Sequence, residues 1–121
     1  MAPLAARSFH DLLVWQKSHA LALRIYKCSA GFPKSELFGL ASQMRRAAVS
    51  VPANVAEAFG RSTRPEKARL LNIAQGSLDE LRYYLVLSKD LGYPTDPGVA
   101  EAAEEVGRML GAYRRKVVSA D

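Results

Sequence analysis

Basic side chains gather in one part of this 121-residue sequence, and their chemistry is that of phosphate binding. The cluster has six cations, Arg45, Arg46, Arg61, Arg64, Lys67 and Arg69, and two carboxylates, so its local charge is +4. Guanidinium groups bind phosphate oxygens in pairs, and clustered cations release counterions on meeting a nucleic acid. The pattern favours an anionic partner, nucleic acid first. A solvated helix face with intersubunit ion pairs explains it equally well.

A second basic run, Arg114-Arg115-Lys116, lies near the C-terminus. Cations at a helix C-terminus complement the helix dipole, and the acidic residues of this segment lie nearer its start. We therefore interpret this run as structural.

Residues that could catalyse a reaction or hold a metal ion are few and unsuitably spaced. Di-iron bundles use Glu-x-x-His pairs, and no glutamate here stands three residues before a histidine. Two histidines, His10 and His19, are too few for most metal sites. The single cysteine, Cys28, is best interpreted as a buried thiol. We predict no catalytic residues, no metal site and no cofactor, and hence a protein that is not an enzyme.

The composition is that of one globular domain, with 49% hydrophobic and 24% charged residues. The stretch before Arg7 is too short for the apolar region of a signal peptide. The uncharged run from Ala47 to Ala56 is about half a membrane span. We predict a cytoplasmic protein with no membrane partner, a single domain over residues 1–121 and a short N-terminal arm at 1–8.

Helix-breaking residues cluster at three places and divide the chain into four helix-sized segments. We predict helices at roughly 11–30, 36–60, 64–92 and 96–118. Four helices joined by short loops predict an all-α fold, an up-down-up-down antiparallel four-helix bundle. The expected caps and first-turn prolines are Ser8 or Asp11, Ser35, Ser62 or Thr63, Pro65 and Pro97.

Apolar residues recur at spacings of three and four in each segment, as in a bundle seam. The clearest positions are Val14, Leu21, Ile25 and Cys28; Leu37, Met44, Val51 and Val55; Leu71, Leu78, Leu81 and Leu85; and Val99, Val106, Leu110 and Tyr113. Pro52 interrupts the second helix, where we expect a kink, with two shorter helices as the alternative. Four glycines inside predicted helices suggest close helix approach, within the chain or between chains: Gly39, Gly76, Gly107 and Gly111.

An ordered series of short motifs resembles a known family. The first part includes Phe9-His10-Asp11-Leu12, Val14-Trp15-Gln16-Lys17 and Phe32-Pro33. The stronger part is Glu36-Leu37-Phe38-Gly39-Leu40, Gln43-Met44-Arg45-Arg46-Ala47-Ala48-Val49-Ser50 and Asn54-Val55-Ala56-Glu57, followed by Gly60-Arg61, Gly76-Ser77 and Leu91-Gly92-Tyr93. Together these resemble the 23S ribosomal RNA intervening-sequence proteins, which are related to accessory bundle proteins of diversity-generating retroelements.

The resemblance implies a cytoplasmic, non-enzymatic four-helix bundle that assembles as a homopentamer. It also implies an association with nucleic acid, RNA favoured, because some members are encoded inside insertions in ribosomal RNA genes. Its motifs mark five residues as structural or interface positions: Trp15, Gln43, Asn54, Glu57 and Gly60. For Asn54 and Glu57 we favour a structural role over a binding notch. For Trp15 we favour packing over base stacking.

Two functional hypotheses follow from the sequence. In the first, the chain is a non-enzymatic oligomeric scaffold that binds nucleic acid through the basic cluster. Contacts would be made mainly with the backbone and would be sensitive to salt. In the second, the chain is a protein–protein adaptor whose arginines build the ring and whose client is a protein. Charge reversal at Arg45 and Arg46 separates them, because it abolishes assembly in the second case and nucleic-acid affinity in the first.

Overall fold

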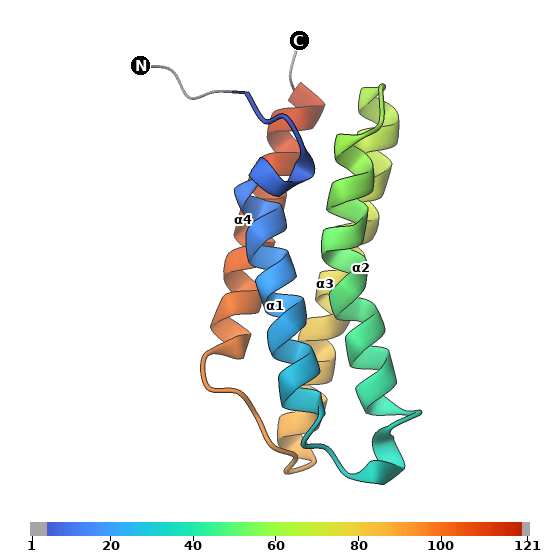
Figure 1. Cartoon of the computed structure of the whole chain (residues 1–121), viewed down its shortest axis with the longest axis vertical. Helices are drawn as coiled ribbons and strands as arrows, with labels where there is room; N and C mark the ends of the chain where they lie inside the picture. The colour runs from blue at the N-terminus through green and yellow to red at the C-terminus, as the bar shows by residue number, and fades with distance from the viewer. Residues whose placement is uncertain (1–4, 120–121) are drawn as a thin grey trace.

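Four antiparallel helices form the protein, and the computed structural model describes residues 5–119. They are α1 (Leu13–Ser29), α2 (Leu40–Phe59), α3 (Arg64–Asp90) and α4 (Val99–Ser119). Each helix packs against the next, and α4 packs back against α1 (Figure 1). The predicted up-down-up-down bundle is confirmed. Part of the predicted arm, residues 1–4, and residues 120–121 of the predicted domain lie outside the described residues.

One apolar core runs the length of the bundle, and the predicted seam positions line it. Val14, Leu21, Ile25, Met44, Val51, Val55, Leu71, Leu78, Leu81, Val106 and Leu110 are all buried. Cys28, Leu85 and Tyr113 pack at its margin. Leu37 is an exception with 52% of its surface exposed, because α2 begins after it.

The first two helices begin later than predicted. Residues Phe9–Asp11 form a short 3-10 turn, η1, whose cap is Ser8, and Leu12 then takes an extended conformation before α1. The second helix was predicted from residue 36, but Lys34–Glu36 form another 3-10 turn, η2, and α2 begins only at Leu40. Ser35 is not its cap. The Leu40 amide instead donates to the Glu36 carboxylate at 3.1 Å.

Gly39 lies at the N-cap of α2 and not inside a helix, contrary to the prediction. A Cβ atom at this position would lie 2.7 Å from the Glu36 Oε1 atom that accepts the Leu40 amide. Glycine therefore leaves room for this cap. From Leu40, α2 runs as one helix through Pro52, so the alternative of two shorter helices is wrong. The kink at Pro52 stays a prediction.

The third helix begins as predicted, because the Thr63 hydroxyl accepts a hydrogen bond from the Glu66 amide at 3.3 Å and Pro65 lies in the first turn. The fourth begins at Val99 and not at residue 96. Gly98, at a φ of +83°, precedes it, and the Gly98 carbonyl accepts the Ala102 amide at 3.0 Å. Pro97 therefore lies outside the helix.

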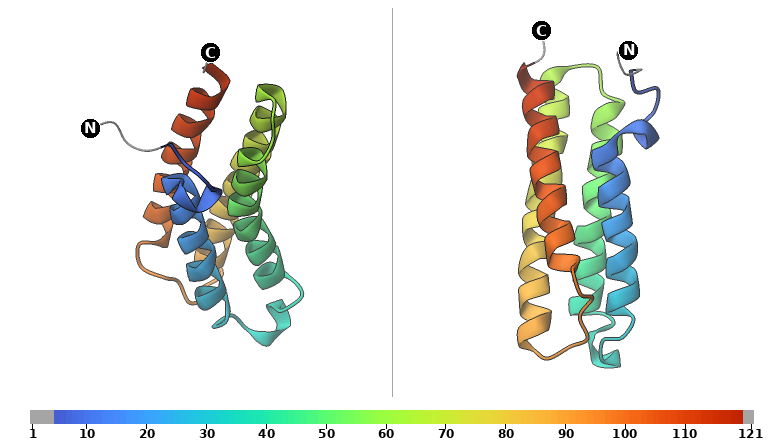
Figure 2. Two further views of the ribbon diagram at one scale, coloured as in Figure 1. Left: turned by 45° about the horizontal axis from the view of Figure 1, so that its top comes forward. Right: turned by 90° about the vertical axis from the view of Figure 1, so that its left-hand side faces the viewer.

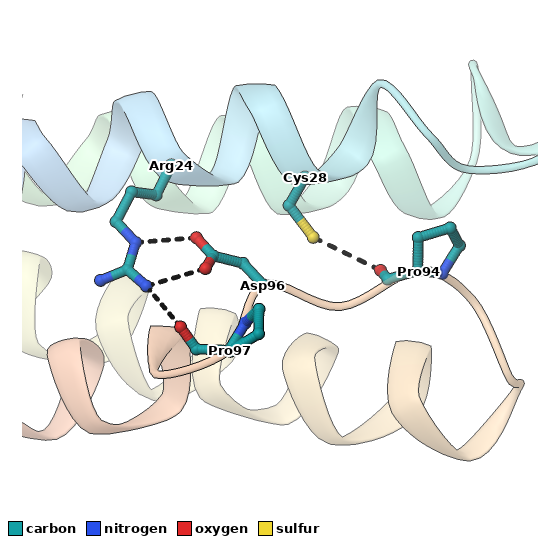
Figure 3. A network of polar contacts seen from close by, with 5 residues as sticks. All are labelled: Arg24, Cys28, Pro94, Asp96 and Pro97. Carbon is teal, nitrogen blue, oxygen red and sulfur yellow. Dashed lines mark hydrogen bonds and ion pairs between the residues drawn. The ribbon is translucent and has the colours of Figure 1, made fainter.

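The loop between α3 and α4, residues 91–98, is held against α1 (Figure 3). The Arg24 guanidinium donates to both oxygens of Asp96, at 2.7 and 2.9 Å, and to the Pro97 carbonyl at 2.9 Å. Arg24 also holds the pKa of the Asp96 carboxyl below its usual range. The Cys28 thiol donates to the Pro94 carbonyl at 3.4 Å, and burial raises the pKa of this thiol. We call the contacts of Arg24 with the loop the clamp. They hold the loop at the point where α4 begins.

Candidate nucleic-acid interface

Four of the predicted cations lie at the junction between α2 and α3. Gly60 is the C-cap of α2, and Arg61, Arg64, Lys67 and Arg69 follow within the junction and the first turns of α3. Arg61 pairs with Glu57 at 2.9 Å, one helical turn away on the surface. The Lys67 ammonium donates to the carbonyls of Ala58 and Phe59, both at 3.0 Å.

These contacts separate the four cations by role. Lys67 satisfies carbonyls at the end of α2, so its charge also stabilises that helix terminus. Arg61 can exchange its exposed partner for a phosphate at little cost, because surface ion pairs contribute at most about 1 kcal/mol. Arg64 and Arg69 are exposed.

Arg45 and Arg46 lie far from that junction, so the structure divides the six cations into two groups. At a rise of about 1.5 Å per residue, Arg46 and Arg61 lie roughly 22 Å apart along the bundle. Arg45 donates to the Ser29 hydroxyl at 2.8 Å and to the Tyr26 carbonyl at 3.2 Å, and its guanidinium lies over the Tyr26 ring. The Arg45 side chain therefore joins α2 to the end of α1.

Arg46 belongs to a polar chain between α2 and α3. Its guanidinium donates to the Gln43 side chain at 2.8 Å and lies 3.6 Å from Glu80. The Tyr84 hydroxyl donates to the same carboxylate at 2.6 Å, which raises the pKa of Tyr84. Gln43 thus orients an arginine whose charge is already partly balanced.

The bundle brings the second basic run to the end where α2 meets α3. Because α4 is antiparallel to α3 and packs against it, its last turns lie at the same end of the bundle as the first turns of α3 (Figures 1 and 2). The register agrees, since Arg82 of α3 pairs with Glu104 of α4 at 3.7 Å. Arg115 and Lys116 are exposed, and Arg114 is half-buried.

We call this combined surface the basic end, defined by Arg61, Arg64, Lys67, Arg69, Arg114, Arg115 and Lys116. With Glu57 and Glu66 included, its seven cations and two carboxylates give a net charge of +5, equal to that of the whole chain. The rest of the sequence is therefore neutral overall. Sequence reasoning assigned Arg114–Lys116 to the helix dipole alone, although the antiparallel topology itself implies that α4 ends beside the start of α3.

Aromatic rings lie at the same end of the bundle, around the start of α1. Trp15 stacks on His19 with a centroid distance of 4.9 Å, and the rings of Phe9 and His10 lie 5.0 and 5.1 Å from it. Trp15 is half-buried against the core, whereas both histidines are exposed. Trp15 therefore packs, and it also holds exposed imidazole rings beside it.

Asn54 joins a hydrogen-bonded link between α2 and α3. Its side-chain amide donates to the Ser50 carbonyl at 2.8 Å and to the Ser50 hydroxyl at 3.0 Å. The Ser50 and Ser77 hydroxyls lie 2.7 Å apart across the two helices. Glu57 is exposed and pairs with Arg61 instead, so Asn54 and Glu57 have different partners within the chain. A structural role for Asn54 stays a prediction.

Other kinds of site have little support in the described residues. Within residues 5–119, no group of three or more His, Cys, Asp or Glu side chains could hold a metal ion. No helix in the same stretch is long and apolar enough to cross a membrane.

The sequence profile of one protein family matches residues 10–112, most of the chain. Its description is 23S rRNA-intervening sequence protein. The chain belongs to this family. The resemblance that the motifs of α1 and α2 indicated is therefore confirmed. No curated protein matches this member of the 23S rRNA-intervening sequence protein family significantly.

A solved structure shares the fold of this 23S rRNA-intervening sequence family member. It is the 1.70 Å crystal structure of a protein of unknown function from the S23 ribosomal protein family of Bacteroides thetaiotaomicron. The two sequences are 27% identical, the TM-score is 0.75, and the match covers 85% of this chain and 99% of the other. Neither description names a catalytic activity.

Proposed function

We propose that this protein is a non-enzymatic cytoplasmic scaffold that binds nucleic-acid backbone, RNA in preference to DNA, through its basic end. One observation carries the proposal: the packing of α4 against α3 adds the basic run at the end of α4 to the cations at the junction of α2 and α3, and together they give this end of the bundle a net charge of +5. A surface with an excess of positive charge attracts a polyanion and raises its rate of encounter. The preference for RNA is supported by the family description, which refers to 23S rRNA.

The contacts expected at this surface are mainly with phosphates. Arg69, Arg115 and Lys116 are exposed and make no side-chain ion pair within the described part of the chain. They are therefore available for charge-assisted hydrogen bonds to phosphate oxygens. The exposed imidazoles of His10 and His19 add rings on which unpaired bases can stack. We expect little sequence preference, because phosphate contacts position a protein without reading bases.

Assembly would multiply this surface. We propose a homo-oligomer, a pentamer by the family resemblance, in which five copies would carry a charge of +25. Several weak basic ends on one particle would bind a long RNA with an avidity that a single copy lacks.

Fluorescence anisotropy tests the proposal, using nucleic-acid-free protein with a labelled structured RNA or a labelled duplex DNA at several salt concentrations. We expect binding that weakens steeply as salt rises, with the RNA bound more tightly than the DNA. The absence of binding even at low salt would refute the proposal and would favour the adaptor hypothesis, with a protein as the client. Equal affinities for RNA and DNA would contradict the preference for RNA.

A further inference from the structure

Four aromatic rings gather where η1 meets the start of α1, and the two imidazoles among them are exposed. We call Phe9, His10, Trp15 and His19 the aromatic cluster. Phe9 and His10 stack with their centroids 4.2 Å apart and their planes at 24°, and the planes of Trp15 and His19 meet at only 9°. Phe9 and Trp15 are partly buried. Each exposed imidazole therefore rests on a larger ring that is anchored in the protein.

Hydrogen bonds hold the aromatic cluster in place within the chain. The His10 amide donates to the Ser8 hydroxyl at 3.2 Å, and the Gln16 side chain donates to the His10 carbonyl at 2.8 Å. The Ser8 hydroxyl also lies 3.2 Å from Nδ1 of His10, which restrains the orientation of this ring. Groups that are already ordered lose little conformational entropy on binding. The cluster thus presents flat rings in one fixed arrangement.

The position of the aromatic cluster decides which flat partner it suits. The cluster lies at the end of the bundle where α1 begins and α4 ends, which is also the basic end (Figures 1 and 2). The Asp11 carboxylate beside His10 is already engaged, because it accepts the amides of Arg7 and Ser8 at 2.9 and 3.3 Å. A nucleobase fits both surfaces at once, since it is a flat π system joined to phosphates.

We propose that the aromatic cluster is a stacking site for an unpaired nucleobase, so that the RNA bound by this protein contains single-stranded segments. This inference rests on the proposed binding of nucleic-acid backbone at the basic end. Bases inside a duplex are already stacked on their neighbours, and an unpaired base is free to stack on His10 or His19. Each stacked base strengthens binding by roughly tenfold. The phosphates of the same strand would meet the exposed side chains of Arg115 and Lys116.

Strands with and without bases separate stacking from phosphate binding. The probes are a labelled single-stranded oligouridylate of about ten nucleotides and an abasic strand with the same number of phosphates, compared by fluorescence anisotropy at low salt. We expect the wild type to bind the oligouridylate roughly tenfold more tightly. Trp15 is the only tryptophan in the chain, so its fluorescence reports on the cluster directly. The oligouridylate should change this fluorescence, and the abasic strand should not.

Two double variants locate the effect on the surface. His10→Leu with His19→Leu removes both exposed rings and keeps side-chain bulk in the cluster, so this variant should bind both strands with equal affinity. Phe38→Leu with Tyr83→Leu is the matched control, because both rings are exposed, at 92% and 59%, and lie away from the basic end. Phe38 precedes α2, and Tyr83 lines a pocket beside the α3–α4 loop. The control should keep the wild-type preference.

The outcomes distinguish this inference from the proposed function on which it rests. Equal wild-type affinities for the two strands, unchanged Trp15 fluorescence, a preference that survives in the histidine variant, or an equal loss in the control would overturn the stacking site. The abasic strand still binds in each of these cases, so the basic end would stand. Failure of both strands to bind would refute the proposed function and the inference with it. Circular dichroism checks the fold of each variant, and the fluorescence of wild-type Trp15 decides if the histidine variant unfolds.

Discussion

Removing three cations from the basic end should flatten the salt dependence of RNA binding. We choose Arg69→Ala, Arg115→Ala and Lys116→Ala together, because these side chains are exposed and none forms an ion pair within the described residues. Surface changes of this kind shift stability by no more than about 0.5 kcal/mol each. The triple variant should therefore remain folded, and a change in binding can be attributed to lost phosphate contacts.

The expected magnitude follows from counterion release. Each lost phosphate contact lowers the slope of log K against log salt by about 0.9 on a duplex and about 0.7 on a single strand. Three lost contacts lower it by about 2.7 or about 2.1. Between 50 and 200 mM salt, duplex affinity of the wild type should thus fall about 40-fold more than that of the variant. Anisotropy titrations at four or five salt concentrations measure both slopes.

A matched variant at the opposite end provides the control. Lys27→Ala, Lys34→Ala and Lys89→Ala remove the same charge from the end of α1, the loop after it and the end of α3. This variant should keep the wild-type slope. Equal flattening in both triple variants would show that net charge acts without a localised site, and an unchanged slope in the first variant would refute the basic end as the binding surface.

Three further predictions concern stability and can be checked by urea denaturation. Gly76→Ala should raise the free energy of unfolding by about 1 kcal/mol, because a Cβ at this helical position meets nothing within 4 Å; a destabilised variant would indicate packing against another chain. A double-mutant cycle of Arg24→Ala with Asp96→Asn should give a coupling of about 1 kcal/mol, low because the pair is partly exposed; a value near zero would contradict the clamp. Since Arg24 lowers the folded-state pKa of Asp96, its contribution is complete above the usual value of 3.8 and is lost as pH falls through the lower folded value. Asp96→Asn should therefore lose less stability than the wild type on acidification; equal losses would refute the coupling.

Helix positions away from the loops could be predicted from local pattern. The seam residues Leu71, Leu78 and Leu81 are buried as expected, because a bundle helix must turn its apolar face inward. Thr63 caps α3 as expected, since that hydrogen bond joins residues three apart. The starts of the other helices could not be predicted, because contacts with distant residues decide them. Asp96, for example, binds Arg24 of α1.

The candidate site, too, could be predicted from the sequence only in part. Charge type and clustering along the chain pointed to Arg61, Arg64, Lys67 and Arg69, and the structure keeps these four at one junction. Arg45 and Arg46 lie earlier along α2. Because each helical turn advances the chain by about 5.4 Å, they are too far from that junction to belong to the same group. A glycine inside a predicted helix was also not a reliable sign of close helix approach. Gly107 lies close to Leu78 of α3, whereas Gly76 faces open space within the chain.

The sequence by itself determined the number of helices, their inward faces, the antiparallel order and the family, because these depend on the periodicity within each segment, on the short loops between segments and on the order of the motifs along the chain. Only the tertiary structure decided which charges are exposed and which are already bonded, since topology does not set side-chain contacts such as those of Lys67 with the carbonyls at the end of α2. It also decided that Phe38 is exposed and that an apolar pocket lies beside the α3–α4 loop. Burial and pocket formation depend on how helices pack, and no local pattern contains that information.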